Sequence, residues 1–163
     1  DFQFDIPQGK DIEKTTYYFV RHAEKDTTNP KDDDPQLTEE GIRRANYLAT
    51  YFDDKELELF YSTDYSRTIQ TLIPTIHKYK GNIQSYDAKK NTLFTEEFWK
   101  KTYGKNVLVI GHSNTNPKFV NEILAEKKYQ ELDENNYDVF FKVEIDKDIT
   151  VKDTKITKKV PED

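Results

Sequence analysis

The chain has 163 residues and a formal net charge of −6, with 34% hydrophobic and 34% charged residues. Its acidic balance argues against broad nucleic-acid binding, which depends on exposed positive charge, and its sequence has no apolar run near the ~18 residues that a membrane span needs. The absence of cysteine excludes disulfides, thiol catalysis and cysteine-ligated metals. The length suits a single domain, 1–163, in which 1–14 carry no sustained pattern and form a lead-in segment.

From residue 15 onward, strand and helix patterns alternate along the chain. Short runs of β-branched and aromatic residues predict strands at 16–20, 57–61, 83–86 and 107–110. Apolar residues at helical spacing predict helices at 38–52, 64–79, 93–103 and through 119–124, and Thr38 is the expected cap of the first. The polar stretch 25–36 is a loop by composition.

The end of the chain changes to an alternating pattern. Apolar residues alternate over 139–145 and again at Ile149 and Val151, on either side of a turn at 146–148, which predicts a hairpin. Four strand–helix units followed by a hairpin predict a three-layer α/β/α sandwich with a mostly parallel central sheet and an antiparallel C-terminal edge. Ligands of such sheets bind beyond the carboxyl ends of the strands.

Residues able to bind or transfer a phosphoryl group follow these strand ends. Arg21 and His22 come directly after the first strand, Arg67 lies in the first turns of the second helix, and His112 follows the strand at 107–110. Guanidinium groups bind phosphate oxygens through paired hydrogen bonds. Each residue alone fits an ordinary structural role, such as an ion pair or a helix-surface charge, and only their joint placement predicts one phosphate site.

The segments around these residues resemble, in the same order, the motifs of the histidine phosphatase superfamily, whose members have a phosphoglycerate-mutase-like fold. The resemblance runs from about residue 17 to residue 115, which is most of the domain. Its four segments are Tyr18-Phe19-Val20-Arg21-His22-Ala23-Glu24 for Arg-His-Gly, Leu37-Thr38-Glu39-Glu40-Gly41 for Leu-Thr-x-x-Gly, Ser62 to Thr71 for Ser-x-x-x-x-Arg-x-x-x-Thr, and Gly111-His112 for Gly-His.

The resemblance implies a metal-independent phosphatase that hydrolyses phosphate monoesters through a phosphohistidine. His22 would attack phosphorus, while Arg21, Arg67 and His112 bind the transferring group and stabilise its charge. No metal or other cofactor is implied, because the arginines supply the positive charge, and a zinc site is disfavoured because the histidines lack a local pair. The expected substrate is a phosphorylated small molecule or a phosphoprotein.

The resemblance leaves the proton donor for the leaving group open. One branch of the superfamily uses a Glu after the third strand, and the other uses an Asp directly after the second His, where this chain has Ser113. Asp87, just past the third strand, is the first candidate, Glu24 is the second, and the third alternative is that no dedicated acid exists. Ala23 also stands where the superfamily has Gly, so a non-glycine residue must accept that turn.

Two other functions remain open on the same fold. Because no obvious acid is present, a non-catalytic module that binds phosphate or phosphoproteins stays open as the alternative to the phosphatase. A phosphoglycerate-type mutase is disfavoured, because the predicted helices and strand between Arg67 and His112 leave little length for a lid that would keep water out. The sequence identifies neither the natural substrate nor the oligomeric state.

The sequence also leaves the cellular location open. Because it contains no methionine, we expect that a segment preceding Asp1 was removed or left out. A cleaved secretion signal or lipoprotein leader and a trimmed chain explain this equally well, so we expect a periplasmic or cell-envelope location and a cytoplasmic one with equal weight.

Overall fold

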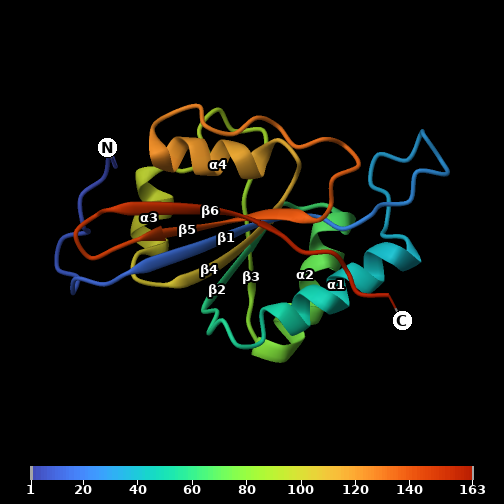
Figure 1. Ribbon diagram of the computed structural model, residues 1–163, viewed down its shortest axis with the longest axis horizontal. Helices are drawn as coiled ribbons and strands as arrows, with labels where there is room; N and C mark the ends of the chain where they lie inside the picture. The colour runs from blue at the N-terminus through green and yellow to red at the C-terminus, as the bar shows by residue number, and fades with distance from the viewer. Residues whose placement is uncertain (1, 163) are drawn as a thin grey trace.

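The chain folds around a six-stranded sheet whose order is β3-β2-β4-β1-β5-β6. In the computed structural model, which describes residues 2–162, the first four strands run parallel and the last two form an antiparallel hairpin beside β1 (Figure 1). The strands are β1 (Thr15–Arg21), β2 (Leu59–Ser62), β3 (Ile83–Ser85), β4 (Asn106–Gly111), β5 (Val139–Ile145) and β6 (Val151–Thr157). The predicted α/β sandwich with an antiparallel C-terminal edge is confirmed.

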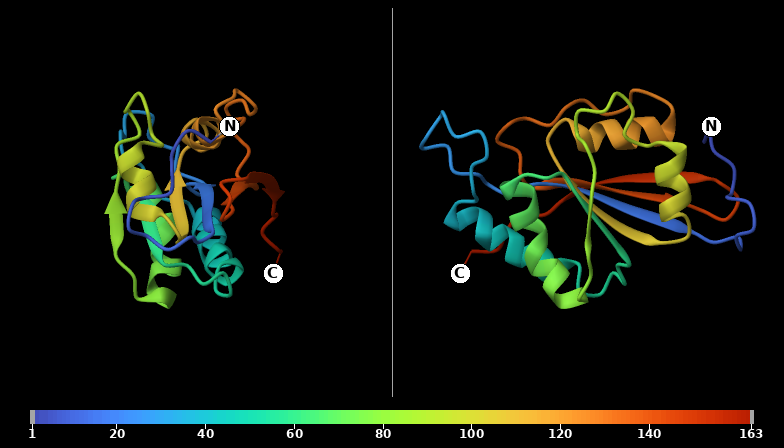
Figure 2. Two further views of the ribbon diagram at one scale, coloured as in Figure 1. Left: turned by 90° about the vertical axis from the view of Figure 1, so that its left-hand side faces the viewer. Right: turned by 180° about the vertical axis from the view of Figure 1, so that it is seen from behind.

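Two helices cover each face of the sheet. They are α1 (Glu39–Tyr51), α2 (Ser66–Tyr79), α3 (Glu96–Thr102) and α4 (Thr115–Leu124). In Figures 1 and 2, α3 and α4 lie on one face and α1 and α2 on the other. Because successive side chains of a strand point to opposite faces, Tyr17 and Phe19 of β1 join the core under α3 and α4, whereas Tyr18 and Val20 join the core under α1 and α2.

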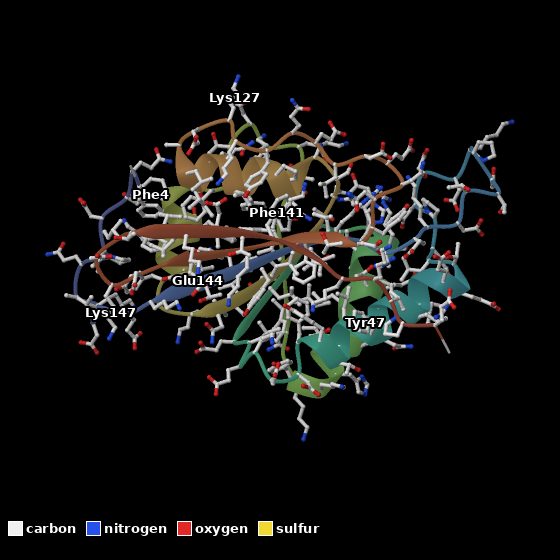
Figure 3. The ribbon with its side chains drawn as sticks, viewed as in Figure 1. Phe4, Tyr47, Lys127, Phe141, Glu144 and Lys147 are labelled. Carbon is white, nitrogen blue, oxygen red and sulfur yellow. The ribbon has the colours of Figure 1, made fainter. Side chains whose placement is uncertain are left out.

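The lead-in segment is packed against the domain. Phe2, Phe4 and Ile6 contact the larger core, and the indole Nε1 of Trp99 donates to the carbonyl oxygen of Asp5 at 2.8 Å. Figure 3 shows Phe4 beside α3, while Phe141 lies between the sheet and α4. Phe2, Phe4 and Ile6 are half-buried, and each contributes a part of the roughly 1.5–3 kcal/mol that complete burial of such a side chain gives. Together they fix a stretch whose sequence has no regular pattern.

Two element boundaries differ from the sequence prediction. Helix α3 begins at Glu96, later than predicted, because the hydroxyl of Thr95 accepts from the Phe98 N–H at 3.1 Å and caps the helix there. Strand β6 runs from Val151 to Thr157, whereas the prediction placed the second strand of the hairpin at Ile149 and Val151, of which only Val151 lies in β6. It is an edge strand whose side chains alternate between exposed and half-buried positions, so it needs no apolar periodicity to pair with β5.

Candidate active site

His22 lies just beyond the carboxyl end of β1 and is buried, with 4% of its surface exposed. Its backbone N–H donates to the Gly111 carbonyl oxygen at 2.8 Å, which joins the ends of β1 and β4. Its ring Nδ1 lies 2.8 Å from the carbonyl oxygen of Ala23. A carbonyl oxygen can only accept, so Nδ1 carries the proton and Nε2 of the neutral ring keeps its lone pair. The backbone therefore selects the tautomer that a nucleophilic Nε2 requires.

The surroundings of His22 also keep it neutral. Burial lowers its pKa to about 3; the bond to Ala23 opposes this, and the charges of Arg21 and Arg67 add to the lowering together with His112. An imidazole ring without a proton on Nε2 can attack phosphorus, whereas a protonated ring cannot. The surroundings thus keep the His22 ring neutral at pH values well above 3.

The backbone turn after His22 is held by a side chain of α2. The N–H of Ala23 donates to the Thr71 hydroxyl at 2.8 Å, and that hydroxyl donates to the Arg67 carbonyl oxygen at 2.7 Å. Ala23 is fully buried and its φ is not positive. The turn therefore accepts alanine without backbone strain. Thr71 links Ala23, whose carbonyl oxygen accepts from His22 Nδ1, to α2, the helix that carries Arg67.

Arg21 is the last residue of β1, and its guanidinium is held by the loop between α4 and β5. Its NH1 donates to the carbonyl oxygens of Asp133 and Asn136 at 3.3 and 3.0 Å, and its Cζ lies 4.1 Å from the centre of the Tyr137 ring. Its buried Nε has no hydrogen-bond partner. Burial lowers the pKa of Arg21, while Tyr137 and Glu134 oppose that effect. The loop fixes one edge of this guanidinium and leaves the Nε donor unused.

Arg67 and His112 are positioned by residues that follow β2. The Arg67 Cζ lies 4.5 Å from the Tyr65 ring centre, and its buried Nε also has no partner. His112 Nε2 lies 2.9 Å from the hydroxyl oxygen of Thr63, and the His112 ring centre is 5.5 Å from that of His22. Burial, followed by the charges of Arg67 and Arg21, lowers the pKa of His112 to about 4. An anion beside His112 would oppose this lowering and favour the protonated donor form.

These four side chains line one pocket with a volume of about 380 Å³. Two unpartnered buried N–H donors on residues that line a pocket match the needs of an anion with several acceptor oxygens. The pocket also contains residues that are not among the predicted site residues, namely Lys25, Ser113, Asn114, Glu131, Leu132 and Glu134. Lys25 could have been suspected from its place three residues after His22, but nothing in the sequence marks the residues of the α4–β5 loop.

Two glycines of the motifs are required by close packing. A side chain at Gly41 would place its Cβ 2.3 Å from the Glu24 carbonyl oxygen, where α1 begins against the segment that follows His22. At Gly111, the Cβ would lie 2.5 Å from the hydroxyl oxygens of Thr115 and Tyr86. Real Cβ atoms do not approach this closely, so both glycines let their elements meet beside the pocket.

Neither candidate proton donor is among the residues that line the pocket. Asp87 is exposed; its carboxylate accepts from the Lys89 N–H at 2.9 Å, and it lines a neighbouring hollow beside Thr63 and Tyr65. Glu24 accepts two hydrogen bonds from the Arg44 guanidinium at 2.9 and 3.0 Å. Arg44 also pairs with Asp138 at 2.9 Å. Glu24 therefore ties the segment after His22 to α1 and to the start of β5.

Neither a metal cluster nor a membrane helix is found in the part of the chain that the structure describes. Over residues 2–162, no group of three or more His, Asp or Glu side chains is arranged to hold a metal ion. No helix in this range is long and apolar enough to span a membrane. His77, the third histidine, is exposed near the end of α2, away from the pocket residues.

Comparison with known proteins supports the family resemblance that the sequence motifs indicate. Residues 17–91 match the family model described as the histidine phosphatase superfamily (branch 1). No curated protein matches the chain. The fold matches a phosphoserine phosphatase from Entamoeba histolytica solved in complex with 3-phosphoglyceric acid, at 13% identity, with 89% of this chain and 98% of that chain covered and a TM-score of 0.69.

Two further solved structures show the same fold. A phosphoglycerate mutase from Bacillus anthracis is 17% identical, with coverage of 88% and 94% and a TM-score of 0.67. The protein histidine phosphatase SixA, complexed with tungstate, is 15% identical, with coverage of 87% and 96% and a TM-score of 0.68. The family-model match and this fold confirm the resemblance of the chain to the histidine phosphatase superfamily, with a phosphoglycerate-mutase-like architecture.

Proposed function

We propose that this protein is a metal-independent phosphatase that hydrolyses phosphate monoesters through a phosphohistidine on His22. The observation that carries the proposal is the pairing of a neutral, tautomer-fixed His22 with unpartnered guanidinium donors in one pocket. The family-model match and the fold support phosphatase activity in general. The particular reaction follows from what these side chains can do.

In the first half of the reaction, the Nε2 lone pair of His22 forms a bond to phosphorus as the ester P–O bond breaks. Arg21 and Arg67 offer their free N–H groups to the phosphoryl oxygens, and His112 joins them as a donor once the anion has raised its pKa. The Ala23 carbonyl oxygen keeps its hydrogen bond to Nδ1–H, so it stabilises the positive charge that the ring gains. The phosphoryl group is then held on nitrogen.

In the second half, water attacks phosphorus and the P–N bond breaks, which returns His22 to its starting form and releases inorganic phosphate. We propose that no dedicated acid protonates the leaving oxygen in the first half, because neither Asp87 nor Glu24 lines the pocket and the two carboxylates that do, Glu131 and Glu134, are exposed to solvent. The leaving oxygen then takes its proton from solvent. Substrates with good leaving groups, such as phenols, should therefore turn over fastest.

The test is hydrolysis of para-nitrophenyl phosphate with a chelator present, comparing the wild type with His22→Ala. We expect chelator-resistant release of nitrophenol by the wild type and release at background level by the variant. Rapid alkaline quenching should trap a phosphoryl adduct on the wild type only, and acid treatment should then release it as inorganic phosphate. Asp87→Asn and Glu24→Gln should lower the rate far less than His22→Ala does.

Other outcomes would point to the two alternative functions. A folded wild type that binds phosphate but neither hydrolyses the ester nor forms the adduct would be a phosphate-binding module. Transfer of the trapped phosphoryl group to a second hydroxyl of 3-phosphoglycerate, at a rate above its hydrolysis, would indicate a mutase.

A further inference from the structure

The loop between α4 and β5, residues 125–138, borders the histidine pocket on one side. Figures 1 and 2 show it running from the end of α4 toward the edge of the sheet at which β1 ends. The Leu132 N–H donates to the Ser113 carbonyl oxygen at 3.0 Å, and Arg21 donates to the carbonyl oxygens of Asp133 and Asn136. The loop is therefore fixed at two points to the segments that carry the site, and its side chains have defined places around the pocket.

Two of these side chains bring negative charge to a pocket that is otherwise built for an anion. Glu131 and Glu134 are exposed and line the same pocket as Arg21, His22 and Arg67. Among the ion pairs of the described residues, none involves either glutamate. We call these two carboxylates the acidic rim.

An acidic rim at a phosphate pocket discriminates between substrates. It repels a small molecule whose leaving group carries further negative charge, and it attracts one whose leaving group carries positive charge. Each exposed charge pair changes an affinity by a factor of about 1.5 to 5. Two carboxylates acting on oppositely charged substrates can therefore separate them by about an order of magnitude, an effect that falls with ionic strength.

The space next to the acidic rim continues along α4. A second hollow, of about 730 Å³, shares Asn114 and Glu131 with the histidine pocket and runs past Pro117 and Ala125 to Tyr129. It exceeds the room that the leaving group of a small phosphomonoester needs.

The charged side chains that line this hollow are Lys118, Glu122, Glu126, Lys127 and Glu131, so its formal charge of −1 has the same sign as the acidic rim. The Lys118 ammonium donates to the Lys90 carbonyl oxygen, and the Lys127 side chain points away from the protein body in Figure 3. Glu126 and Glu131 are exposed. A chain of several residues carrying positive charge fits both the shape and the charge of the surface next to the pocket.

We infer that the acidic rim and the hollow along α4 select polypeptide substrates in which Lys or Arg residues flank the phosphorylated side chain. The inference rests on the proposed phosphatase function and names its substrate class. Glu131 and Glu134 act on the flanking cations, while the phosphoryl group itself is held by the arginines and His22.

The test compares three phosphotyrosine peptides of equal length whose flanking residues are Arg, Ser or Asp. Phosphotyrosine has a phenol leaving group, so turnover does not depend on an acid. We expect kcat/KM for the Arg peptide to exceed that for the Asp peptide about tenfold at low salt, with the ratio shrinking as salt is added. In Glu131→Gln/Glu134→Gln the ratio of the two kcat/KM values should fall to about one, and because it is a ratio it is not affected by a change in the basal rate.

The matched control is Glu96→Gln/Glu97→Gln, which removes the same charge from the exposed start of α3 and should keep the wild-type ratio. Equal rates for the Arg and Asp peptides, or a ratio that the rim variant leaves unchanged, would overturn the inference without affecting the proposed phosphatase function. O-Phosphotyramine places a cation on a small molecule with the same phenol leaving group; if its kcat/KM matches that of the Arg peptide, the polypeptide part of the inference is wrong.

The affinity of the same peptides for His22→Ala, measured by fluorescence anisotropy, tests the effect of their charge without turnover. The Arg peptide should bind about tenfold more tightly than the Asp peptide at low salt. Equal affinities would refute the selectivity even if no peptide were hydrolysed.

Discussion

Arg67 is the side chain whose removal should affect the phosphoryl group most directly with the least damage to the fold. It is only partly buried, its Nε has no partner, and its main contact is the Tyr65 ring. We expect Arg67→Ala to lower kcat/KM for para-nitrophenyl phosphate about 10²–10³-fold, as the loss of one preorganised donor does in other sites. Arg67→Lys should recover part of this loss, because lysine restores the charge without the planar fork.

The control for this prediction is His77→Ala, at an exposed position near the other end of the same helix. It should leave both the rate and the melting temperature unchanged. A rate for Arg67→Ala within threefold of the wild type would show that this arginine does not contact the transferring group.

The pH dependence of activity should reflect the suppressed protonation of His22. A free histidine loses its nucleophilic lone pair below about pH 6.5, but here burial lowers the pKa to about 3. The folded protein should therefore hydrolyse para-nitrophenyl phosphate down to about pH 4, once the rate is corrected for the protonation of the substrate. An acid limb with a midpoint near 6.5 in kcat/KM would contradict the assigned state of His22.

At the scale of secondary-structure elements, the α4–β5 loop acts on the site through Tyr137. Its ring packs on the Arg21 guanidinium, whose Cζ is 4.1 Å from the ring centre. A cation–π contact of this kind is worth about 0.5–2 kcal/mol, so Tyr137→Leu should lower kcat/KM about 2- to 30-fold. Tyr137→Phe keeps the ring and should stay near the wild type.

A purely structural role for Tyr137 would give a different pattern in two measurements. If the ring only stabilises the loop, Tyr137→Leu should lower the melting temperature and leave kcat per folded molecule unaltered. If it positions Arg21, the leucine variant should lower kcat at saturating substrate while its melting temperature changes little.

The sequence predicted the elements that position the site far better than it predicted the loop that completes it. Arg21, His22, Arg67 and His112 meet because parallel strands end at one edge of the sheet, a rule that needs only the strand order. The α4–β5 loop binds Arg21 through backbone carbonyl oxygens, which every residue possesses, so no side-chain pattern marks those contacts. Strand β6 was underestimated for a related reason, since an edge strand buries little apolar surface.

At the scale of the whole molecule, two histidines that are kept neutral should make its stability depend on pH. Their folded pKa values are about 3 for His22 and about 4 for His112, below the value of about 6.5 expected in the unfolded chain. The unfolded chain therefore binds protons that the folded chain does not as the pH falls below 6.5, and the free energy of unfolding decreases until the folded pKa values are reached. Above about pH 6.5 both states are neutral at these positions and the full contribution is present.

His22→Gln isolates the contribution of one of these histidines. The glutamine amide can still donate to the Ala23 carbonyl oxygen, but it does not titrate. At pH 5 the unfolded-state protonation of His22 costs about 2 kcal/mol of stability. Urea unfolding at pH 7.5 and pH 5 should therefore show a loss about 2 kcal/mol smaller in His22→Gln than in the wild type. His77→Gln, at an exposed position away from the pocket, is the matched control and should lose as much stability as the wild type. Equal losses in all three proteins would mean that His22 takes up its proton in the folded state, which would remove the basis for its role as the nucleophile near pH 5.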